Sequence, residues 1–324
     1  AGLRRAFRLP QPASPAPPVP AGAALAVPGL APLVTPNPDF YRIDTALIVP
    51  VVDVDRWRLR VTGMVEQEIE LDFAGLASRP MIERYVTLCC VSNEVGGNLI
   101  GNARWLGWPV RELLGLARPL PEADMVLSRS VDGFTASTPL EVLLDNRDAM
   151  VAVGMNGEPL PLEHGYPARL VVPGLYGYVS ATKWVTELRL TRFADEAAYW
   201  TVRGWSPRGP VKLSSRIDTP RDGARVAPGT VVVAGVAWAQ HTGISGVQLR
   251  VDEGPWQDAG LAAAISRDTW RQYRFAWPAA PGRHVLQVRA IDAAGREQTG
   301  EVAGVVPDGA TGWHTVAVEV AGAG

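Results

Sequence analysis

The chain has 324 residues, 47% hydrophobic and 20% charged, a composition typical of soluble globular protein with about two domains. The net charge of −2 and the lack of a long basic run argue against a nucleic-acid partner. No apolar run reaches the roughly 18 residues that a membrane-spanning helix needs. The two cysteines, Cys89 and Cys90, are adjacent, which argues against a disulfide framework and against an ordinary zinc site.

Residues 1–38 predict a tether rich in proline and alanine. They contain 10 of the chain's 28 prolines and too few large apolar residues to fold alone. Two alternatives remain open for this segment: a disordered tail, or an arm wrapped around the folded part. The chain begins with Ala, and Arg4-Arg5 lacks a following apolar stretch, so a mature or excised fragment is expected and not a twin-arginine signal.

Residues 39–217 predict a catalytic domain of the α+β class. Runs rich in strand-forming residues cover 46–52, 57–65, 168–180 and 183–191, and helical patterns cover Pro109–Ala117 and Pro139–Asp145. The regular strand–helix alternation of a doubly wound sheet is missing, which favours α+β.

Residues 218–324 predict an immunoglobulin-like β-sandwich. After a junction near Ile217–Pro220, short alternating runs recur between turns, and few helical patterns remain. These runs cover 231–239, 247–259, 270–279, 284–292 and 313–320.

The segment Thr87–Val110 (TLCCVSNEVGGNLIGNARWLGWPV) contains the most informative chemistry. A cysteine thiolate is a soft ligand suited to a transition metal, and the glycines that follow allow the backbone to approach a ligand closely. By these residues alone a second interpretation stays open, because a buried cysteine is more often a small packed hydrophobe than a ligand.

This segment closely resembles the molybdopterin-binding segment of the sulfite oxidase family. The matching residues are Thr87, Leu88, Cys90, Asn93, Gly101, Asn102, Ala103, Arg104, Trp105, Gly107, Leu113 and Leu114. The resemblance implies that Cys90 is the protein's ligand to molybdenum and that Cys89 is a packed neighbour. It also implies that Asn93 belongs to the cofactor's surroundings, where outer-shell groups tune a metal.

A second block, from Met155 to Trp184, resembles the same family in order and spacing (MNGEPLP, HGYPARLVVPG and KW). The resemblance implies that His164 and Arg169 bind the pterin and its phosphate, together with Lys183 and nearby Ser180. Arginine and lysine are suitable residues, since a phosphate takes arginine as a bidentate donor and lysine as a point charge.

The stretch Phe40–Asp44 resembles the family's entrance strand. The resemblance makes Arg42 a candidate for the substrate or the cofactor, and it places Asp44 where histidine is usual. Landmarks around Trp238, Trp256, Trp270 and Trp313 resemble the family's dimerisation domain, so the likeness extends over residues 39–320. A haem-binding domain is not evident.

The resemblance implies oxygen-atom transfer at one molybdopterin-bound molybdenum per chain, with a protein that positions and tunes the cofactor. The substrate-binding residues depart from a sulfite site: Val95 stands where an arginine is expected, and Gln240 and His241 stand where another is expected. Trp205 occupies a position near the metal that is usually tyrosine, so Arg42, Trp205 and His241 are the catalytic candidates beside Cys90.

The partners implied are a small-molecule substrate, an external electron acceptor or donor such as a cytochrome or a membrane redox protein, and a second copy of the chain. The tether favours an extracytoplasmic domain attached to a membrane through an absent N-terminal region. Two other functions are weighed: reduction of a sulfoxide or other small molecule on the same cofactor, and a non-catalytic extracellular binding module that has lost the metal.

Overall fold

The structure is a computed structural model that describes residues 7–322. It divides into two compact units, each assembled from separate stretches of chain. The first unit contains the described residues up to Pro17, Pro36–Val91 and Ala103–Pro210; the second contains Pro18–Thr35, Ser92–Asn102 and the described residues from Val211 onward. The predicted boundaries at 38 and 217 follow the chain linearly, whereas both units are discontinuous in sequence.

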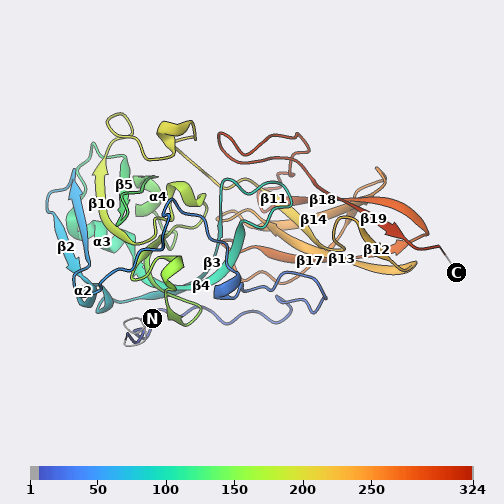
Figure 1. The fold of residues 1–324 in the computed structure, drawn as a ribbon, viewed down its shortest axis with the longest axis horizontal. Helices are drawn as coiled ribbons and strands as arrows, with labels where there is room; N and C mark the ends of the chain where they lie inside the picture. Colours follow the sequence, from blue (N-terminus) through green and yellow to red (C-terminus); the bar gives the residue numbers. More distant parts are fainter. Residues whose placement is uncertain (1–6, 323–324) are drawn as a thin grey trace. The chain divides into compact units, whose positions relative to one another are not determined.

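The first unit is built on two β-sheets (Figure 1). One has the order β2-β1-β10-β5-β6, formed by β2 (Ile69–Asp72), β1 (Arg58–Gly63), β10 (Val185–Thr191), β5 (Met125–Ser130) and β6 (Thr135–Pro139). The other has the order β3-β4-β7-β8, formed by β3 (Ile82–Cys89), β4 (Ile100–Pro109), β7 (Met150–Met155) and β8 (Glu158–Pro159), with β9 (Arg169–Val171) also paired to β7. The core beside this second sheet is closed by Phe40, Trp105 and Tyr166.

The predicted α+β class is wrong, because strands hold 39% of the residues and helices only 9%. The described residues contain three α-helices: α2 (Phe73–Ala77), α3 (Val110–Ala117) and α4 (Leu140–Leu144). Helices α3 and α4 lie where the sequence predicts them, each directly after a proline at the N-cap position. They are only eight and five residues long and serve as connections between strands. The two helical patterns therefore predicted real helices, but helices too short to make the domain α+β.

The strand predicted at 46–52 is also absent. These residues have no regular structure, and Leu47, Ile48 and Val51 are largely exposed. Residues with high strand propensity form a strand only where a neighbouring strand supplies hydrogen bonds and cover, and this run gains neither. The runs at 57–65 and 183–191 contain β1 and β10, which pair in parallel.

The proline-rich segment is packed within the units rather than trailing from them. Within the first unit, Ser14 forms a parallel bridge to Ile82. Within the second unit, the Leu25 amide donates to the Gln272 side chain, and Ala23 is fully buried. Of the two alternatives for residues 1–38, the described part from residue 7 onward adopts the wrapped arm.

The second unit is a β-sandwich of two sheets, ordered β11-β13-β17-β16 and β12-β19-β18-β14-β15. The strands are β11 (Ser214–Thr219), β12 (Ala224–Val226), β13 (Gly229–Trp238), β14 (Ile244–Val251), β15 (Gln257–Asp258), β16 (Gly260–Leu261), β17 (Arg271–Ala279), β18 (Gly282–Asp292) and β19 (His314–Val320). The buried residues of both sheets form one core, including Val233, Leu249, Trp277 and Leu286. The predicted immunoglobulin-like sandwich is present, and its five predicted runs overlap β13, β14, β17, β18 and β19.

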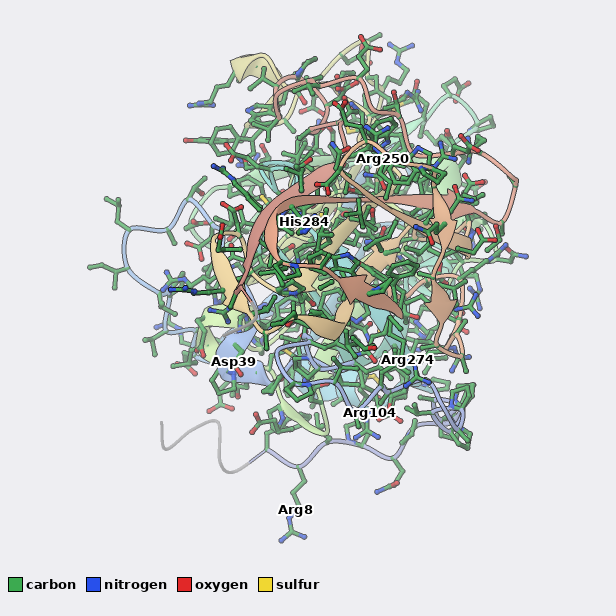
Figure 2. All side chains as sticks on the ribbon, turned by 90° about the vertical axis from the view of Figure 1, so that its right-hand side faces the viewer. Arg8, Asp39, Arg104, Arg250, Arg274 and His284 are labelled. Atoms are coloured by element: carbon green, nitrogen blue, oxygen red, sulfur yellow. The ribbon has the colours of Figure 1, made fainter. Side chains whose placement is uncertain are left out.

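An arginine–tryptophan cluster lies on the sheet that contains β14 and β18. The Arg250 guanidinium lies 4.9 Å from the Trp256 ring and 4.8 Å from the Trp313 ring, and Arg289 lies 4.6 Å from Trp256. Arg250 is labelled in Figure 2. Two of the landmark tryptophans therefore have a structural role, since they carry cation–π contacts that hold this face together.

Over residues 7–322, every helix is too short or too polar to cross a lipid bilayer.

Candidate functional site

The end of strand β3 positions the two cysteines. Val86 and Leu88 pack into the core beside the sheet, and β3 ends at Cys89, immediately before Cys90. Cys89 is 2% exposed and Cys90 is 8% exposed, and both are thiols rather than a disulfide. The Cys89 sulfur lies 3.5 Å from the Cys90 carbonyl oxygen. Strand β3 thus positions Cys90 as the first residue after its end, where the side chain is buried.

Arg169, the first residue of β9, is a buried cation without an acidic partner in the described chain. It is 5% exposed, and its guanidinium donates only to backbone carbonyls: those of His164 at 3.2 Å, Leu170 at 3.4 Å and Ala181 at 3.4 Å. It also lies 5.1 Å from the Trp105 ring. Burial lowers the pKa of Arg169 to about 10. Since an uncompensated buried charge is costly, this site suits an anionic ligand.

His164 lies at the end of the short 3₁₀-helix η2 (Leu162–His164) and is 2% exposed. Its Nε2 lies 3.0 Å from the Asn37 carbonyl oxygen, so Nε2 carries the proton and donates it. The next residue, Gly165, has φ +110°, and a Cβ there would come within 3.1 Å of the Arg169 and Lys183 side chains. Glycine is required here because it lets the two cationic side chains approach the turn.

The buried position of His164 predicts acid-sensitive stability. Burial is the main cause that lowers the pKa of His164 from 6.5 to about 4. Between these values the unfolded chain binds more protons than the folded chain, so stability falls as pH falls through this window. We expect the free energy of unfolding of the wild type, measured with urea, to fall by about 3 kcal/mol from this group between pH 7 and pH 4. The His164→Gln variant should lack this contribution. An equal loss in both proteins would contradict the assignment.

Asp44 forms ion pairs with both Lys183 and Arg42. The Lys183 ammonium donates to Asp44 at 2.7 Å and to the Glu163 carbonyl at 3.0 Å, while Arg42 Nε donates to Asp44 at 3.0 Å. Burial lowers the pKa of Lys183 to about 8, although the Asp44 hydrogen bond acts in the opposite direction. Burial opposes the charge of Asp44, but the hydrogen bonds from Arg42 and Lys183 hold the pKa of this carboxyl below its usual value. Asp44 therefore holds Lys183 in place.

Ser180 is fully buried just after the 3₁₀-helix η3 (Gly177–Val179). Its hydroxyl donates to the Tyr176 carbonyl at 2.8 Å, which closes the turn of chain that precedes Lys183. The next residue, Ala181, offers its carbonyl to Arg169. The structure thus gives Ser180 a part in shaping the segment that surrounds the two cations.

Tyr41 also lies in this region, and the sequence assigned it no role. Its ring stacks on Phe40 with centroids 5.3 Å apart. Burial raises the pKa of Tyr41 well above its usual value; negative charge on Cys90 and Cys89 adds to this effect, and the positive charge of Arg169 opposes it. The signal available in the sequence was its place next to Arg42 in the entrance stretch.

The remaining candidates are Trp205 in the first unit and Asn93 and His241 in the second. Trp205, in the first unit, is half-buried and contacts the rings of Tyr178 and Trp200. In the second unit, Asn93 accepts a hydrogen bond from the Leu99 amide at 2.8 Å and so closes its own loop. His241 is a turn residue with φ +67°, and its Nδ1 pairs with Asp268 at 2.9 Å.

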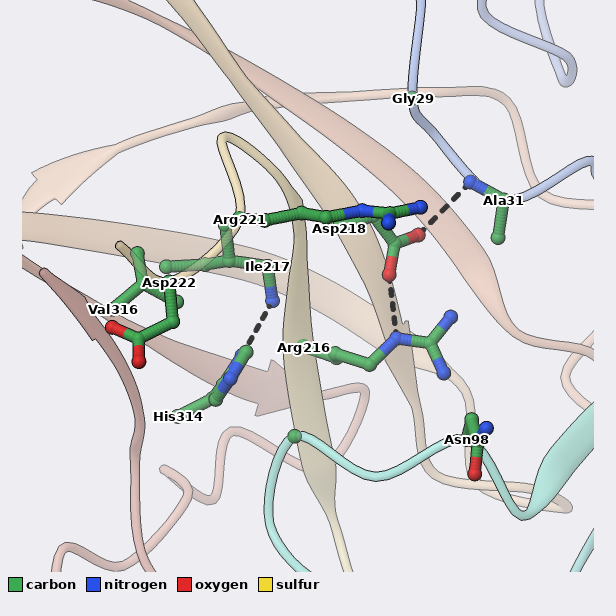
Figure 3. Close-up of a pocket in the computed structure, with 11 residues that line it drawn as sticks. Gly29, Ala31, Asn98, Arg216, Ile217, Asp218, Arg221, Asp222, His314 and Val316 are labelled. Atoms are coloured by element: carbon green, nitrogen blue, oxygen red, sulfur yellow. Dashed lines mark hydrogen bonds and ion pairs between the residues drawn. The ribbon is translucent and has the colours of Figure 1, made fainter. Parts of the chain in front are cut away.

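A cavity of about 440 Å³ lies within the second unit (Figure 3). Its Arg216 pairs with Asp218, and its His314 accepts a hydrogen bond from the Ile217 amide at 2.9 Å through Nδ1. Asp218 also accepts from the Ala31 amide at 3.0 Å. Arg216 therefore has an acidic partner within the protein, which the described chain does not provide for Arg169.

The donor set of the first unit fits a molybdenum–pterin cofactor. Among residues 7–322 there is no cluster of three or more His, Cys, Asp or Glu that could hold a metal. A metal bound by Cys90 would thus take most of its ligands from a cofactor. The buried Arg169, lacking an acidic partner in the described chain, has the charge needed for the anionic part of such a cofactor, with Lys183 beside it.

Comparisons with known proteins agree with this donor set. Residues 46–200 match the family described as oxidoreductase molybdopterin binding domain, and residues 214–318 match a bacterial Ig domain. Human mitochondrial sulfite oxidase is 30% identical over 342 residues, which cover 89% of this chain and 62% of that protein. The chain therefore spans less than two thirds of that relative's length.

Two further relatives extend the comparison. The uncharacterized oxidoreductase YuiH of Bacillus subtilis is 31% identical over 157 residues, covering 48% of this chain and 76% of that protein. The crystal structure of the sulfane dehydrogenase SoxCD from Paracoccus pantotrophus superimposes with a TM-score of 0.73 and 25% identity, over 84% of this chain and 75% of that chain. The match of the second unit is to a bacterial Ig domain, not to the dimerisation domain that the sequence suggested.

Proposed function

Since this chain belongs to the sulfite oxidase family of molybdopterin-dependent oxidoreductases, we propose that it catalyses two-electron oxygen-atom transfer at a molybdenum ligated by Cys90. The observation that carries the proposal is the buried Arg169, without an acidic partner in the described chain, in the unit that presents the Cys90 thiol. When bound, the cofactor supplies the two-electron redox chemistry and the exchange of an oxygen atom.

The protein's part is to hold and orient the cofactor. Cys90 provides the soft thiolate. Arg169 and Lys183 bind the anionic groups of the pterin, and Asp44 fixes Lys183 by an ion pair at 2.7 Å. His164 lies beside them and is neutral around pH 7. Its Nε2 donates to the Asn37 carbonyl, so Nδ1 is available as a hydrogen-bond acceptor.

We propose a small sulfur-containing substrate. Two matched relatives are named for sulfite and sulfane. Sulfite oxidation would convert sulfite and water into sulfate, two protons and two electrons. Sulfoxide reduction would consume two electrons and two protons to give a sulfide and water. The proposed substrate site is less cationic than that of a dedicated sulfite enzyme, because Val95 and His241 stand in place of arginines and Arg42 pairs with Asp44. Sulfoxide reduction therefore stays as the alternative.

The predicted electron partner, the homodimer and the extracytoplasmic location stay predictions. Each concerns the surroundings of the protein rather than the chemistry at Cys90. Gel filtration with light scattering tests the dimer directly.

The proposed function is tested by expression with molybdate in a host that makes the cofactor. We expect close to one molybdenum and one pterin per chain, by elemental analysis and pterin fluorescence. We expect turnover with sulfite and a one-electron acceptor dye, or with a sulfoxide and a reduced viologen dye. Folded protein that contains neither molybdenum nor pterin would overturn the proposal and favour a non-catalytic binding module.

A further inference from the structure

The Tyr41 hydroxyl lies beside the chain segment that carries the cysteines. A methyl group added at Gly177 would come within 3.7 Å of this hydroxyl and within 3.9 Å of the Cys89 carbonyl oxygen. The Tyr41 hydroxyl and the end of β3 therefore both border the position of Gly177. The Tyr41 ring is fixed by its stack on Phe40 and by its packing against the core.

This hydroxyl makes no hydrogen bond to another group within the described chain. Tyr41 is half-buried, and a half-buried phenol ordinarily finds a protein or water partner. Its contacts are with the Phe40 ring and with core side chains, which a phenylalanine could make equally well. The hydroxyl is thus left as a hydrogen-bond donor for a group that binds beside the end of β3.

We propose that Tyr41 donates a hydrogen bond to an oxygen atom of the substrate beside the Cys90 thiolate. The proposal rests on the proposed function, which puts the reacting metal at Cys90. The recognised group is an oxygen on sulfur, either the oxyanion of a sulfite-like anion or the oxygen of a sulfoxide, because both accept a hydrogen bond from a phenol. Tyr41 is then a catalytic residue that orients the substrate.

The test compares Tyr41→Phe with Tyr85→Phe, which removes a hydroxyl from a half-buried tyrosine on strand β3. Both proteins are prepared with molybdate, and molybdenum content and thermal midpoint are measured first. Loss of a hydroxyl that makes no protein hydrogen bond leaves both values unchanged. Sulfate, an unreactive oxyanion, is then titrated into the oxidised proteins to measure its affinity. In a separate experiment, KM and kcat are measured for sulfite or for the sulfoxide that the wild type turns over.

We expect Tyr41→Phe to weaken sulfate binding and raise KM by about tenfold or more, as loss of a hydrogen bond to a charged group predicts. Tyr85→Phe should match wild type in both. Fully loaded Tyr41→Phe protein with wild-type sulfate affinity and KM would overturn the role of Tyr41 and leave the proposed function standing. Wild-type protein without molybdenum and pterin would overturn the proposed function and this role with it.

Discussion

Replacing Cys90 with serine is expected to abolish oxygen-atom transfer while the chain stays folded. Serine has nearly the same shape, but its hydroxyl is a hard, poorly acidic group that cannot replace a thiolate on a transition metal. Changes to outer-shell partners of a metal cost about 10–100-fold in affinity or activity, so loss of the protein's own ligand should cost more. Molybdenum content and turnover are measured together with the urea unfolding midpoint.

Cys89→Ala is the matched control one residue away. Cys89 is 2% exposed, and removal of its sulfur should cost about 1 kcal/mol of stability, the ordinary cost of a small change in the core. Molybdenum content and turnover should stay within a fewfold of wild type. The reverse pattern, with molybdenum lost from Cys89→Ala and kept in Cys90→Ser, would show that Cys89 is the ligand and that the resemblance was aligned to the wrong cysteine.

The grouping of three candidate residues could be predicted from the sequence, because their chemistry does not depend on knowing the architecture. Cys90, His164, Arg169 and Lys183 stand in sequence blocks of recognisable order, and the last three surround one turn at Gly165. Tyr41 and Asn37 were missed. Their roles depend on which side of an irregular segment faces the core, and no periodic pattern encodes that direction.

The class of the first unit was predicted wrongly for a physical reason. The runs at 109–117 and 139–145 have good local helical patterns, yet the helices that form are short connections between strands. Tertiary pairing decides which segments become strands, and the exposed apolar run at 46–52 shows that strand propensity without a partner is insufficient. The sequence left open whether the proline-rich segment is a tail or a wrapped arm. Its composition indicates a stiff, extended chain but does not show which surface the chain packs against.

Replacing Arg169 with methionine is expected to empty the site without unfolding the protein. Methionine keeps much of the apolar volume beside Trp105 but removes the charge. Pterin and molybdenum content should fall at least tenfold, since loss of a charge-assisted contact to a buried anion costs about 1.5–3 kcal/mol or more. Arg111→Met, a partly exposed arginine of helix α3, is the control and should keep its cofactor.

The stability of the cofactor-free protein should move in the opposite direction. Burial lowers the pKa of Arg169 to about 10 even though Tyr41 acts in the opposite direction, so the charged form of Arg169 is disfavoured in the empty site. Its three carbonyl contacts, at 3.2–3.4 Å, are long and recover little of that cost. Urea unfolding of cofactor-free Arg169→Met should therefore give a free energy equal to or above that of cofactor-free wild type. A large loss would mean that Arg169 serves the fold, whereas a gain in stability with loss of cofactor identifies a cation kept for its anionic ligand.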